Sequence, residues 1–442
     1  MPLNQTTSGN INNKIGKYRW TICSLIFFAT TINYLDRQVI SLLKPTLEKE
    51  FNWSESDYSN IVIAFQFAYA LGMIGAGRLI DKIGSKLGYA ITLTLWSIAS
   101  ILHAFAAGVW SFAGYRAFLG VTEAGNFPAA FKAVAEWFPR RERAYAAGIF
   151  NSGTNVGAIL APIVVPWLAI NYSWRIAFIA IGAFGFLWLI FWFIFYEVPE
   201  KQKRLSKAEF DYIHSDKDGD DTVEEQPKIS WGRLLVFRQT WAFIAGKFLT
   251  DGIWWFLLFW LPAFLDAQYN LTGMQVSLPI AFVYTLAGVA SVIGGWLPMY
   301  LVKKGFTVVK ARKTSMLIYA FCPLLIIAAQ YAGSYHMWYA IIIIGIAASA
   351  HQAWSANLFT TVSDMFPKNS VASVIGIGGM AGGIGGMLVS KFAGLLFDHY
   401  KNLGHIETGY FIMFLFCGFG YLIAWLIMFI GLVPKMEKVK IA

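Results

Sequence analysis

Four charged side chains stand inside apolar segments of the 442-residue chain: Asp36 and Arg37 in "TINYLDRQVIS", and Arg116 and Glu123 in "GYRAFLGVTE". A charge at the centre of a bilayer costs roughly 2.5 to 3.5 kcal/mol on insertion scales, so each of these residues needs a function or a partner. A carboxyl there can take up and release a proton, whereas an arginine stays cationic and can hold a carboxylate by two hydrogen bonds. The pattern indicates proton-linked binding of an anion.

The spacing of these residues indicates a different role for each. Arg116 and Glu123 are seven residues apart, which places them on one helical face with Gly120 between them. Asp36 and Arg37 point about 100° apart, so we expect Arg37 to face a cavity and bind the substrate carboxylate. Asp36 is then expected to pair with Arg116, and Glu123 to be the main proton carrier. The alternative is a buried ion-pair network that only holds the helices together.

The composition predicts an integral membrane protein, because 57% of the residues are hydrophobic and only 14% are charged. The formal charge of +10 does not indicate nucleic acid, since no basic stretch alternates with exposed aromatic residues. Most of the 35 Lys and Arg instead fall in the tails and in alternate loops, the distribution typical of cytoplasmic segments. Both termini are therefore expected in the cytoplasm.

Apolar runs of about 20 residues, enough to cross a bilayer, recur along the whole chain. They predict an all-α membrane protein of 12 transmembrane helices in two pseudo-symmetric six-helix bundles. The expected spans are 20–43, 57–79, 87–107, 110–136, 144–168, 174–196, 241–266, 277–302, 313–332, 335–361, 371–398 and 407–433. The expected division is a tail at 1–19, a bundle at 20–196, a linker with a short amphipathic helix at 197–240, a bundle at 241–433 and a tail at 434–442.

The two halves share a trace of common ancestry. "WFPRRERAYAAGIFNSGTNVGAIL" from Trp137 aligns without gaps on "MFPKNSVASVIGIGGMAGGIGGML" from Met365. A duplicated bundle of this kind places its binding site between the halves, near the middle of the membrane.

The segment "GRLIDKIGSK" resembles the loop between the second and third helices of the major facilitator superfamily. The positions that carry the resemblance are Gly77, Asp81, Lys82, Gly84 and Lys86. The glycines allow a tight turn, and an aspartate there can pair with a cation or a helix N-terminus across the seam between the halves. The resemblance therefore implies a gating motif.

Three further stretches, at 33–38, 114–144 and 345–367, are similar to the anion:cation symporter family and most like its hexuronate transporters. The resemblance implies a carrier of organic acids with cations, in which the roles given above to Arg37 and Glu123 are those of the sugar-acid carriers. It also implies that Tyr34 and Tyr69 line the site.

A sugar acid carries hydroxyls, which need further polar partners in the cavity. The candidates, with interhelical hydrogen bonding or packing as the alternative for each, are Tyr34, Tyr69, Asn151, Thr154, Asn155, His351, Gln352, Trp354 and Asn357. Lys247 and Asp251 are four residues apart, and we expect them to pair with each other close to the membrane interface rather than to bind a ligand.

Motifs for hydrolysis, metal binding or ATP binding are absent from the sequence, so an enzyme is not indicated. The three cysteines lie in separate segments without ligand spacing, and no cofactor or metal is expected beyond a coupling proton. The glycine-rich "GIGGMAGGIGG" lacks the lysine of a phosphate loop and favours close helix packing.

The sequence therefore predicts a proton-coupled symporter that imports a hexuronate, glucuronate or galacturonate, by alternating access. The alternatives are another organic anion, such as an aldonate, glucarate or tartrate, or exchange of anions on the same fold. We expect a monomer that crosses a bacterial inner membrane many times, with the lipid bilayer and a small organic anion as its partners.

Overall fold

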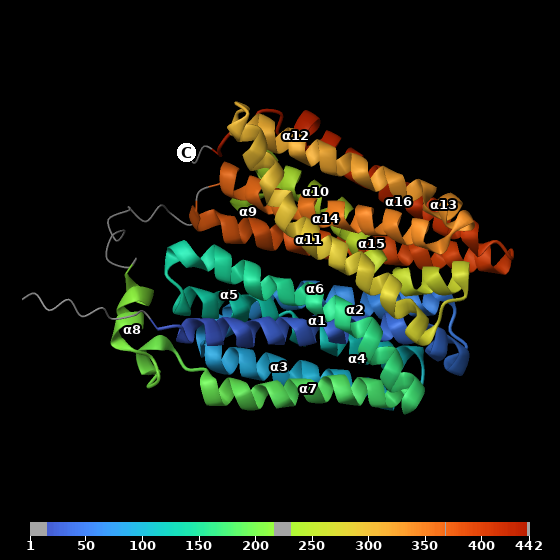
Figure 1. The fold of residues 1–442 in the computed structure, drawn as a ribbon, viewed down its shortest axis with the longest axis horizontal. Helices are drawn as coiled ribbons and strands as arrows, with labels where there is room; N and C mark the ends of the chain where they lie inside the picture. The colour runs from blue at the N-terminus through green and yellow to red at the C-terminus, as the bar shows by residue number, and fades with distance from the viewer. Residues whose placement is uncertain (1–15, 216–230, 367, 440–442) are drawn as a thin grey trace, which may run out of the picture.

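The computed structural model describes residues 16–215, 231–366 and 368–439, which are mostly helical and contain no strand (Figure 1). The first half comprises α1 (Tyr18–Phe51), α2 (Glu55–Ile83), α3 (Ser85–Leu102), α4 (Val109–Glu123), α5 (Asn126–Trp137), α6 (Arg140–Asn171) and α7 (Trp174–Phe195). The short helices α8 (Lys207–His214) and α9 (Trp231–Leu234) follow. The second half comprises α10 (Arg238–Tyr269), α11 (Ser277–Lys303), α12 (Val308–Phe321), α13 (Ala329–Tyr335), α14 (Met337–Met365), α15 (Lys368–Asn402) and α16 (Ile406–Leu426).

Nine of the helical segments in the described ranges are long and apolar enough to cross a membrane. The other predicted spans fall on α1, α2 and the α4–α5 pair, which are helical but more polar or interrupted. The prediction of all-helical membrane architecture is thus confirmed. Twelve crossings remain the prediction for the chain as a whole.

Two predicted spans are less regular than expected. The span 110–136 is not one helix, because α4 ends at Glu123 and α5 begins only at Asn126. Pro128 has no N–H to donate to the carbonyl four residues earlier, so a continuous helix would lose a hydrogen bond at this place. Similarly, α12 passes into a 3₁₀ segment at Cys322–Ala328, which has Pro323 in its first turn.

The two halves lie side by side with their long axes roughly parallel (Figure 1). They meet where α2 packs on α15, α6 on α11 and α1 on α10. The glycine-rich stretch of α15 allows one of the closest approaches within the second half, since a side chain at Gly385 would collide with the backbone of Phe248 in α10. This confirms the packing role predicted for "GIGGMAGGIGG".

The repeated Phe-Pro motif has the same structural position in each half. Phe138 and Pro139 come directly before α6, and Phe366 comes two residues before the start of α15 at Lys368. The aligned segments therefore occupy corresponding places in the two halves, in agreement with the predicted duplication.

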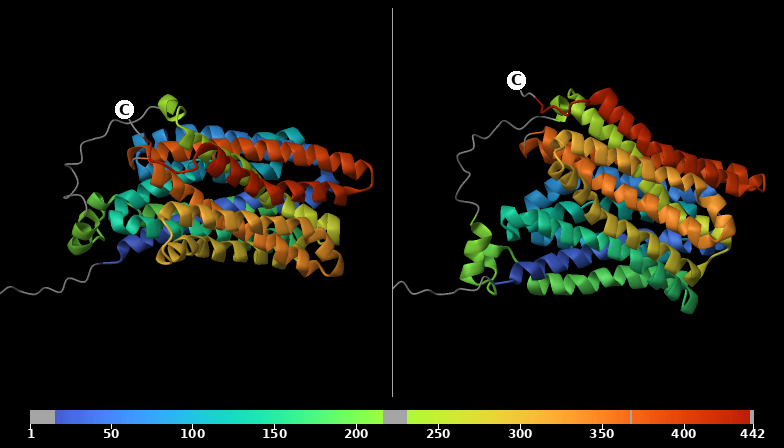
Figure 2. Two further views of the ribbon diagram at one scale, coloured as in Figure 1. Left: turned by 90° about the horizontal axis from the view of Figure 1, so that it is seen from above. Right: turned by 45° about the horizontal axis from the view of Figure 1, so that its top comes forward.

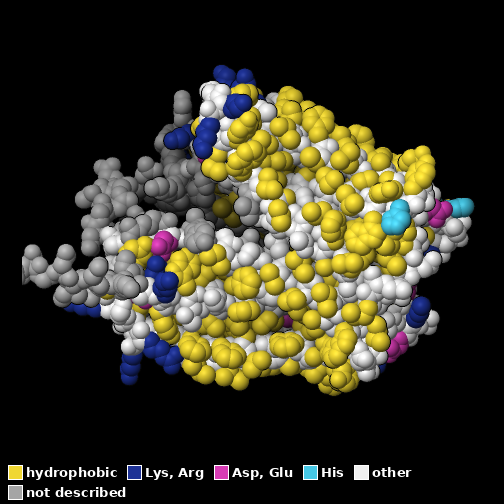
Figure 3. All heavy atoms as spheres, viewed as in Figure 1, with side chains coloured by type: hydrophobic (Ala, Val, Ile, Leu, Met, Phe, Trp, Pro, Cys, Tyr) yellow, Lys and Arg dark blue, Asp and Glu magenta, His cyan; other side chains and the backbone are white. Residues whose placement is uncertain are grey.

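One end of the molecule, which we call the basic end, carries the start of α1, the described end of the chain and most of the visible Lys and Arg (Figure 3). The space-filling surface is hollowed between the halves toward this end (Figure 3). The linker helix α8 lies here beside the start of α1 in both views of Figure 2. The Glu209 carboxylate of α8 accepts hydrogen bonds from the backbone N–H groups of Tyr18 and Arg19, each at 3.0 Å, and so caps α1.

The opposite end, which we call the closed end, joins the halves through charged groups. The Asp398 carboxylate of α15 accepts hydrogen bonds from the backbone N–H groups of Glu55 and Ser56, at 2.7 and 2.9 Å. The Lys401 ammonium of α15 bonds to the carboxylates of Glu48 and Glu55 in the first half. A carboxylate from one half thus caps a helix of the other half.

We expect Asp398→Ala to lower the free energy of unfolding by about 0.5 to 2 kcal/mol, the range for loss of a helix cap. Asp398→Asn keeps one acceptor oxygen and should cost less. Thermal unfolding of the purified protein in detergent measures both effects, with Asp211→Ala on the exposed face of α8 as the matched control. An Asp398→Ala protein as stable as the control would show that the cap does not hold the halves together.

Candidate functional site

A buried ion pair between α1 and α4 forms the centre of the site. The Arg37 Nε donates a hydrogen bond to Glu123 Oε2 at 2.7 Å, and the two side chains are 2% and 0% exposed. Two unit charges in such a dry environment hold each other strongly, and loss of one partner of a buried pair typically costs 3 to 5 kcal/mol. The predicted anion anchor and the predicted proton carrier are therefore in direct contact.

Aromatic rings surround the Arg37 guanidinium. Its carbon lies 4.8 Å from the ring centroid of Tyr34, 4.6 Å from that of Tyr69 and 5.5 Å from that of Phe65. The fourth ring, Trp255 at 5.8 Å, belongs to α10 in the second half. Ring faces attract a cation, so these contacts stabilise the guanidinium and place it at the seam between the halves.

The ion pair leaves hydrogen-bonding capacity unused on both partners. Within the described residues, Arg37 Nη2 and Glu123 Oε1 have no hydrogen-bond partner although both are buried. A guanidinium has five N–H donors, and a carboxylate that replaced Glu123 could accept two of them side by side. The geometry thus suits an exchange of one carboxylate for another on Arg37.

The predicted ion pair between Asp36 and Arg116 is wrong for this structure. Asp36 Oδ1 accepts a hydrogen bond from Ser100 Oγ of α3 at 2.6 Å, and Arg116 Nη2 donates to the backbone carbonyl of Arg37 at 2.9 Å. No ion pair within 4.0 Å joins Asp36 and Arg116 in the part of the chain that the structure describes. Arg116 instead fixes the backbone that carries Arg37, and Phe65 covers its guanidinium at 5.1 Å.

Gly120 brings these groups together. It lies between Arg116 and Glu123 on the face of α4 that packs on α2, and any side chain there would collide with the backbone of Phe65. The close approach of α4 to α2 places the two charged residues beside α1. Arg116 and Glu123 share this face, as predicted. Arg116 binds the backbone carbonyl of Arg37, and Glu123 binds its side chain.

The first-half hydroxyl and amide candidates differ in position. Tyr34 and Tyr69 are partly buried and lie beside the cation, as the resemblance implied. Thr154 is buried and its hydroxyl donates to the carbonyl of Asn151 in the same helix at 2.8 Å, whereas the Asn151 side chain is exposed. Asn155 is partly buried beside Gly288 of α11, at the seam.

The second-half candidates are mostly occupied by protein partners. His351 Nδ1 lies 2.7 Å from the Tyr421 hydroxyl, and the imidazole stacks on Trp254 at 4.7 Å. Trp354 is fully buried, with Tyr421 edge-on to its ring, so stacking on a sugar is not possible here. Gln352 is partly buried in α14.

Asn357 is likewise a structural residue in this conformation. Its amide nitrogen donates to the carbonyls of Gly294 and Ala353, at 2.7 and 2.9 Å, and its oxygen accepts from Arg312 Nη1 at 3.3 Å. The predicted substrate contacts of Trp354 and Asn357 are therefore replaced by contacts within the second half. Both residues therefore fit the alternative given for them above, which is packing and hydrogen bonding between helices.

The motif around Gly84 lies at the basic end. Gly84 has φ +84°, a conformation that favours glycine, and it separates α2 from α3. Lys86 donates to Glu197 Oε2 at 2.7 Å, and this hydrogen bond lowers the pKa of the Glu197 carboxyl. Gly77 and the exposed Lys82 lie in the last turns of α2, and the Asp81 side chain lies outside the described part of the structure.

Three further residues belong to the site but escaped the sequence analysis. Trp255 contacts Arg37 from the other half. Asn33 is fully buried one turn before Arg37, and neither of its amide atoms has a hydrogen-bond partner among the described residues. Gln66 is 1% exposed, and neither of its amide atoms has a hydrogen-bond partner among the described residues. Asn33 could have been found from its spacing of four to Arg37.

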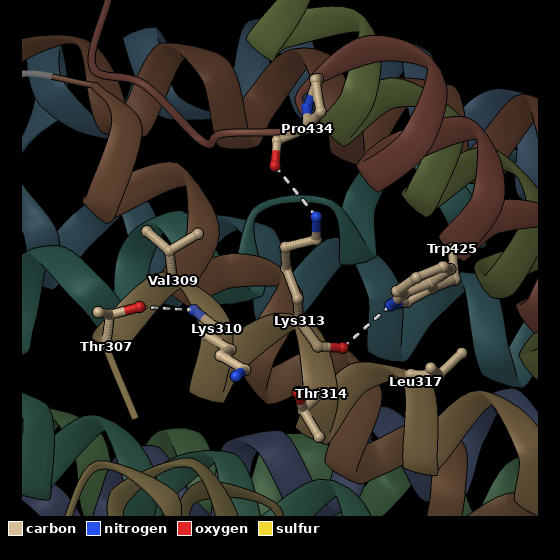
Figure 4. Close-up of a pocket in the computed structure, with 8 residues that line it drawn as sticks. All are labelled: Thr307, Val309, Lys310, Lys313, Thr314, Leu317, Trp425 and Pro434. Carbon is tan, nitrogen blue, oxygen red and sulfur yellow. Dashed lines mark hydrogen bonds between the residues drawn. The ribbon is translucent and has the colours of Figure 1, made fainter. Parts of the chain in front are cut away.

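A separate pocket of about 400 Å³ lies in the second half between α12 and α16 (Figure 4). Lys313 Nζ bonds to the Pro434 carbonyl at 3.0 Å, and Trp425 Nε1 donates to the Lys313 carbonyl at 3.0 Å. These contacts hold the end of the chain against α12, and the pocket shares no residue with the Arg37 site. Within the described ranges no three His, Cys, Asp or Glu side chains gather closely enough to hold a metal ion.

Two paired helical halves with a buried cation and carboxyl at their seam define a multi-pass membrane transporter rather than an enzyme. Residues 26–390 match the family described as Major Facilitator Superfamily, so the chain belongs to that superfamily. The family named from the "GRLIDKIGSK" motif is thereby confirmed.

Within the superfamily, the chain is similar to several transporters named for sugar acids. The chain is 34% identical over 387 residues to the hexuronate transporter of Escherichia coli (strain K12), covering 87% of this chain and 89% of the relative. It is 31% identical over 395 residues to a D-galactonate transporter of Escherichia coli O6:H1, covering 88% and 91%. Both relatives are named for transport of sugar acids.

Among solved structures, a bacterial homologue of the human lysosomal transporter Spinster, in inward-facing and unoccupied conformation, superposes with a TM-score of 0.78. The match covers 96% of this chain and all of that chain at 17% identity. It shows the fold.

We expect double-mutant cycles to distinguish the Arg37–Glu123 ion pair from Asp36 and Arg116, which do not pair with each other. Arg37→Met and Glu123→Gln should be strongly non-additive in the free energy of unfolding, by about 1 to 3 kcal/mol, because each alone leaves an unpaired buried group. Asp36→Asn and Arg116→Met should couple less, since their side chains do not touch. Urea or thermal unfolding in detergent measures all seven proteins, and the reverse order of coupling would contradict the observed contacts.

Proposed function

We propose that the protein imports a hexuronate together with a proton across a bacterial inner membrane by alternating access. The observation that carries the proposal is the direct contact of Arg37 with Glu123, because the ionised Glu123 carboxylate and a substrate carboxylate would compete for the same guanidinium. The name of the hexuronate transporter relative and the polar surroundings of Arg37 support a sugar acid as the anion.

The competition gives coupling a physical basis. In the empty carrier the Glu123 carboxylate occupies Arg37, so a substrate carboxylate must displace it. A protonated Glu123 has no charge to hold the guanidinium, and Arg37 becomes free for the substrate. Because binding of the anion favours the protonated carboxyl, the reverse also holds and the two cargoes travel together.

The conformation suits release or uptake at the basic end. The halves are joined at the closed end by Asp398 and Lys401, and the surface is hollowed toward the basic end (Figure 3). The superposed relative is named as inward-facing and unoccupied. We therefore assign the basic end to the cytoplasm, with both tails, 1–19 and 434–442, and the 197–240 linker on that side. The bundles 20–196 and 241–433 would rock against each other as a monomer.

A second substrate class has its own support. The D-galactonate relative suggests that an aldonate, which keeps the carboxylate and hydroxyls but has an open chain, could occupy the same site. Uptake of labelled glucuronate, galacturonate, galactonate and tartrate into proteoliposomes with an imposed pH gradient decides between them. If an imposed pH gradient drives the uptake of none of these acids, the proposal is overturned.

We expect Glu123→Gln to abolish accumulation against a gradient while counterflow exchange continues, because glutamine cannot carry a proton but leaves Arg37 able to bind the anion. Labelled substrate uptake into proteoliposomes measures both modes. Glu407→Gln makes the same change at an exposed position and is the matched control. Proton-driven accumulation by the Glu123→Gln protein would remove Glu123 from the coupling path.

Arg37→Ala should eliminate measurable substrate binding, because it removes the cation from the site. Arg37→Lys keeps the charge but loses the planar fork, and we expect it to weaken binding by roughly 10- to 100-fold, the loss of one charged hydrogen bond. Quenching of tryptophan fluorescence, for which Trp255 is suitably close, gives the dissociation constants. An unchanged constant in Arg37→Ala would show that the anion binds elsewhere.

A further inference from the structure

A second buried ion pair lies in the other half of the molecule. Lys247 Nζ and Asp251 Oδ2 of α10 are 2.5 Å apart, and their side chains are 8% and 17% exposed. The predicted pairing of these residues is confirmed, but the pair lies well inside the 32-residue helix α10 rather than close to an end of it. Asp251 is also more accessible than either partner of the Arg37–Glu123 pair.

The pair lies on the same face of α10 as Trp255, a residue of the site around Arg37. Lys247, Asp251 and Trp255 are spaced by four residues and share one face of α10. Trp255 on this face contacts the Arg37 guanidinium, which Tyr34 of the first half also contacts, at 4.8 Å from its ring centroid. Asp251 therefore lies about 6 Å, and Lys247 about 12 Å, along the helix axis from Trp255, in the direction of the basic end.

The surroundings leave room for the carboxylate and supply further polar groups. Gly382 of α15 packs directly on Asp251, where any side chain would collide with the carboxylate oxygen. The Lys247 ammonium lies 4.7 Å from the ring centroid of Phe359 and within electrostatic range of His351. His351 is in turn held by Tyr421 at 2.7 Å. The pair is thus built into a polar cluster of the second half.

We propose that Lys247 and Asp251 form a second subsite, which binds the hydroxyl-bearing end of the sugar acid whose carboxylate is held by Arg37. This inference rests on the proposed function. The ammonium donates and the carboxylate accepts, so the pair can bond to neighbouring hydroxyls of a polyol or a sugar ring. A six-carbon skeleton with bonds of about 1.5 Å reaches on the order of 6 Å, close to the axial distance from Trp255 to Asp251.

The subsite also carries a preference between substrate classes. Because Asp251 neutralises Lys247, the pair as a whole has no net charge and suits neutral hydroxyls better than a second carboxylate. The carrier should therefore select acids with one carboxylate, such as glucuronate or galactonate, over the dicarboxylate glucarate. A pair that only stabilises the second half would give no such preference.

The first experiment compares binding of glucuronate with binding of cyclohexanecarboxylate, which has a six-membered ring and a carboxylate but no hydroxyl. In Lys247→Met/Asp251→Leu we expect the affinity for glucuronate to fall at least 10-fold and that for cyclohexanecarboxylate to stay within about twofold. Glu50→Gln/Arg175→Met, which removes an exposed ion pair near the closed end, is the matched control. Equal affinity of the double variant and the wild type for glucuronate would overturn the subsite.

The second experiment uses Asp251→Asn, which is the gentler change should the double variant fail to fold. It keeps a hydrogen-bonding side chain but leaves the Lys247 charge uncompensated. We expect the ratio of glucarate to glucuronate affinity to rise at least fivefold, and an unchanged ratio would overturn the proposed selection. Failure of the wild-type protein to bind either acid would instead refute the proposed function, and binding by wild type that survives Arg37→Ala would refute the anchor alone.

Discussion

The buried contact between Arg37 and Glu123 is the constraint on which the site depends. The buried Arg37 cation is paired with the Glu123 carboxylate at 2.7 Å, and loss of either partner would leave an uncompensated charge. Three neighbouring features support this pair. Arg116 binds the backbone that carries Arg37, Gly120 lets α4 approach, and aromatic rings cover the guanidinium.

Much of this arrangement follows from the sequence, because a long apolar run predicts a membrane helix and a spacing of seven residues predicts a shared helical face. They were sufficient to predict the helices, the membrane class and the shared face of Arg116 and Glu123. They could not predict which partner a buried group takes. A helical face gives the direction of Asp36, but whether Ser100 or Arg116 meets it depends on how α3 and α4 cross α1.

The second half shows the same limit in another form. Polar residues inside a bundle must be hydrogen-bonded whether or not they bind a ligand, so residue type alone does not separate the two uses. Asn357 bonds to two backbone carbonyls and Arg312, while the Lys247–Asp251 pair, expected only to satisfy itself, lies on the face of α10 that reaches Arg37. Position relative to the seam, which requires the fold, decides between them.

The seam also explains how one site can respond to a movement of whole bundles. Arg37, Tyr34 and Tyr69 belong to the first half, whereas Trp255 reaches the cation from the second. A rotation of one half against the other would change the distance between Trp255 and Arg37. It would therefore change how strongly the tryptophan ring stabilises the guanidinium charge. A ligand that bridges Arg37 and α10 favours the orientations in which both contacts are kept, and its binding energy is thereby linked to the relative position of the halves.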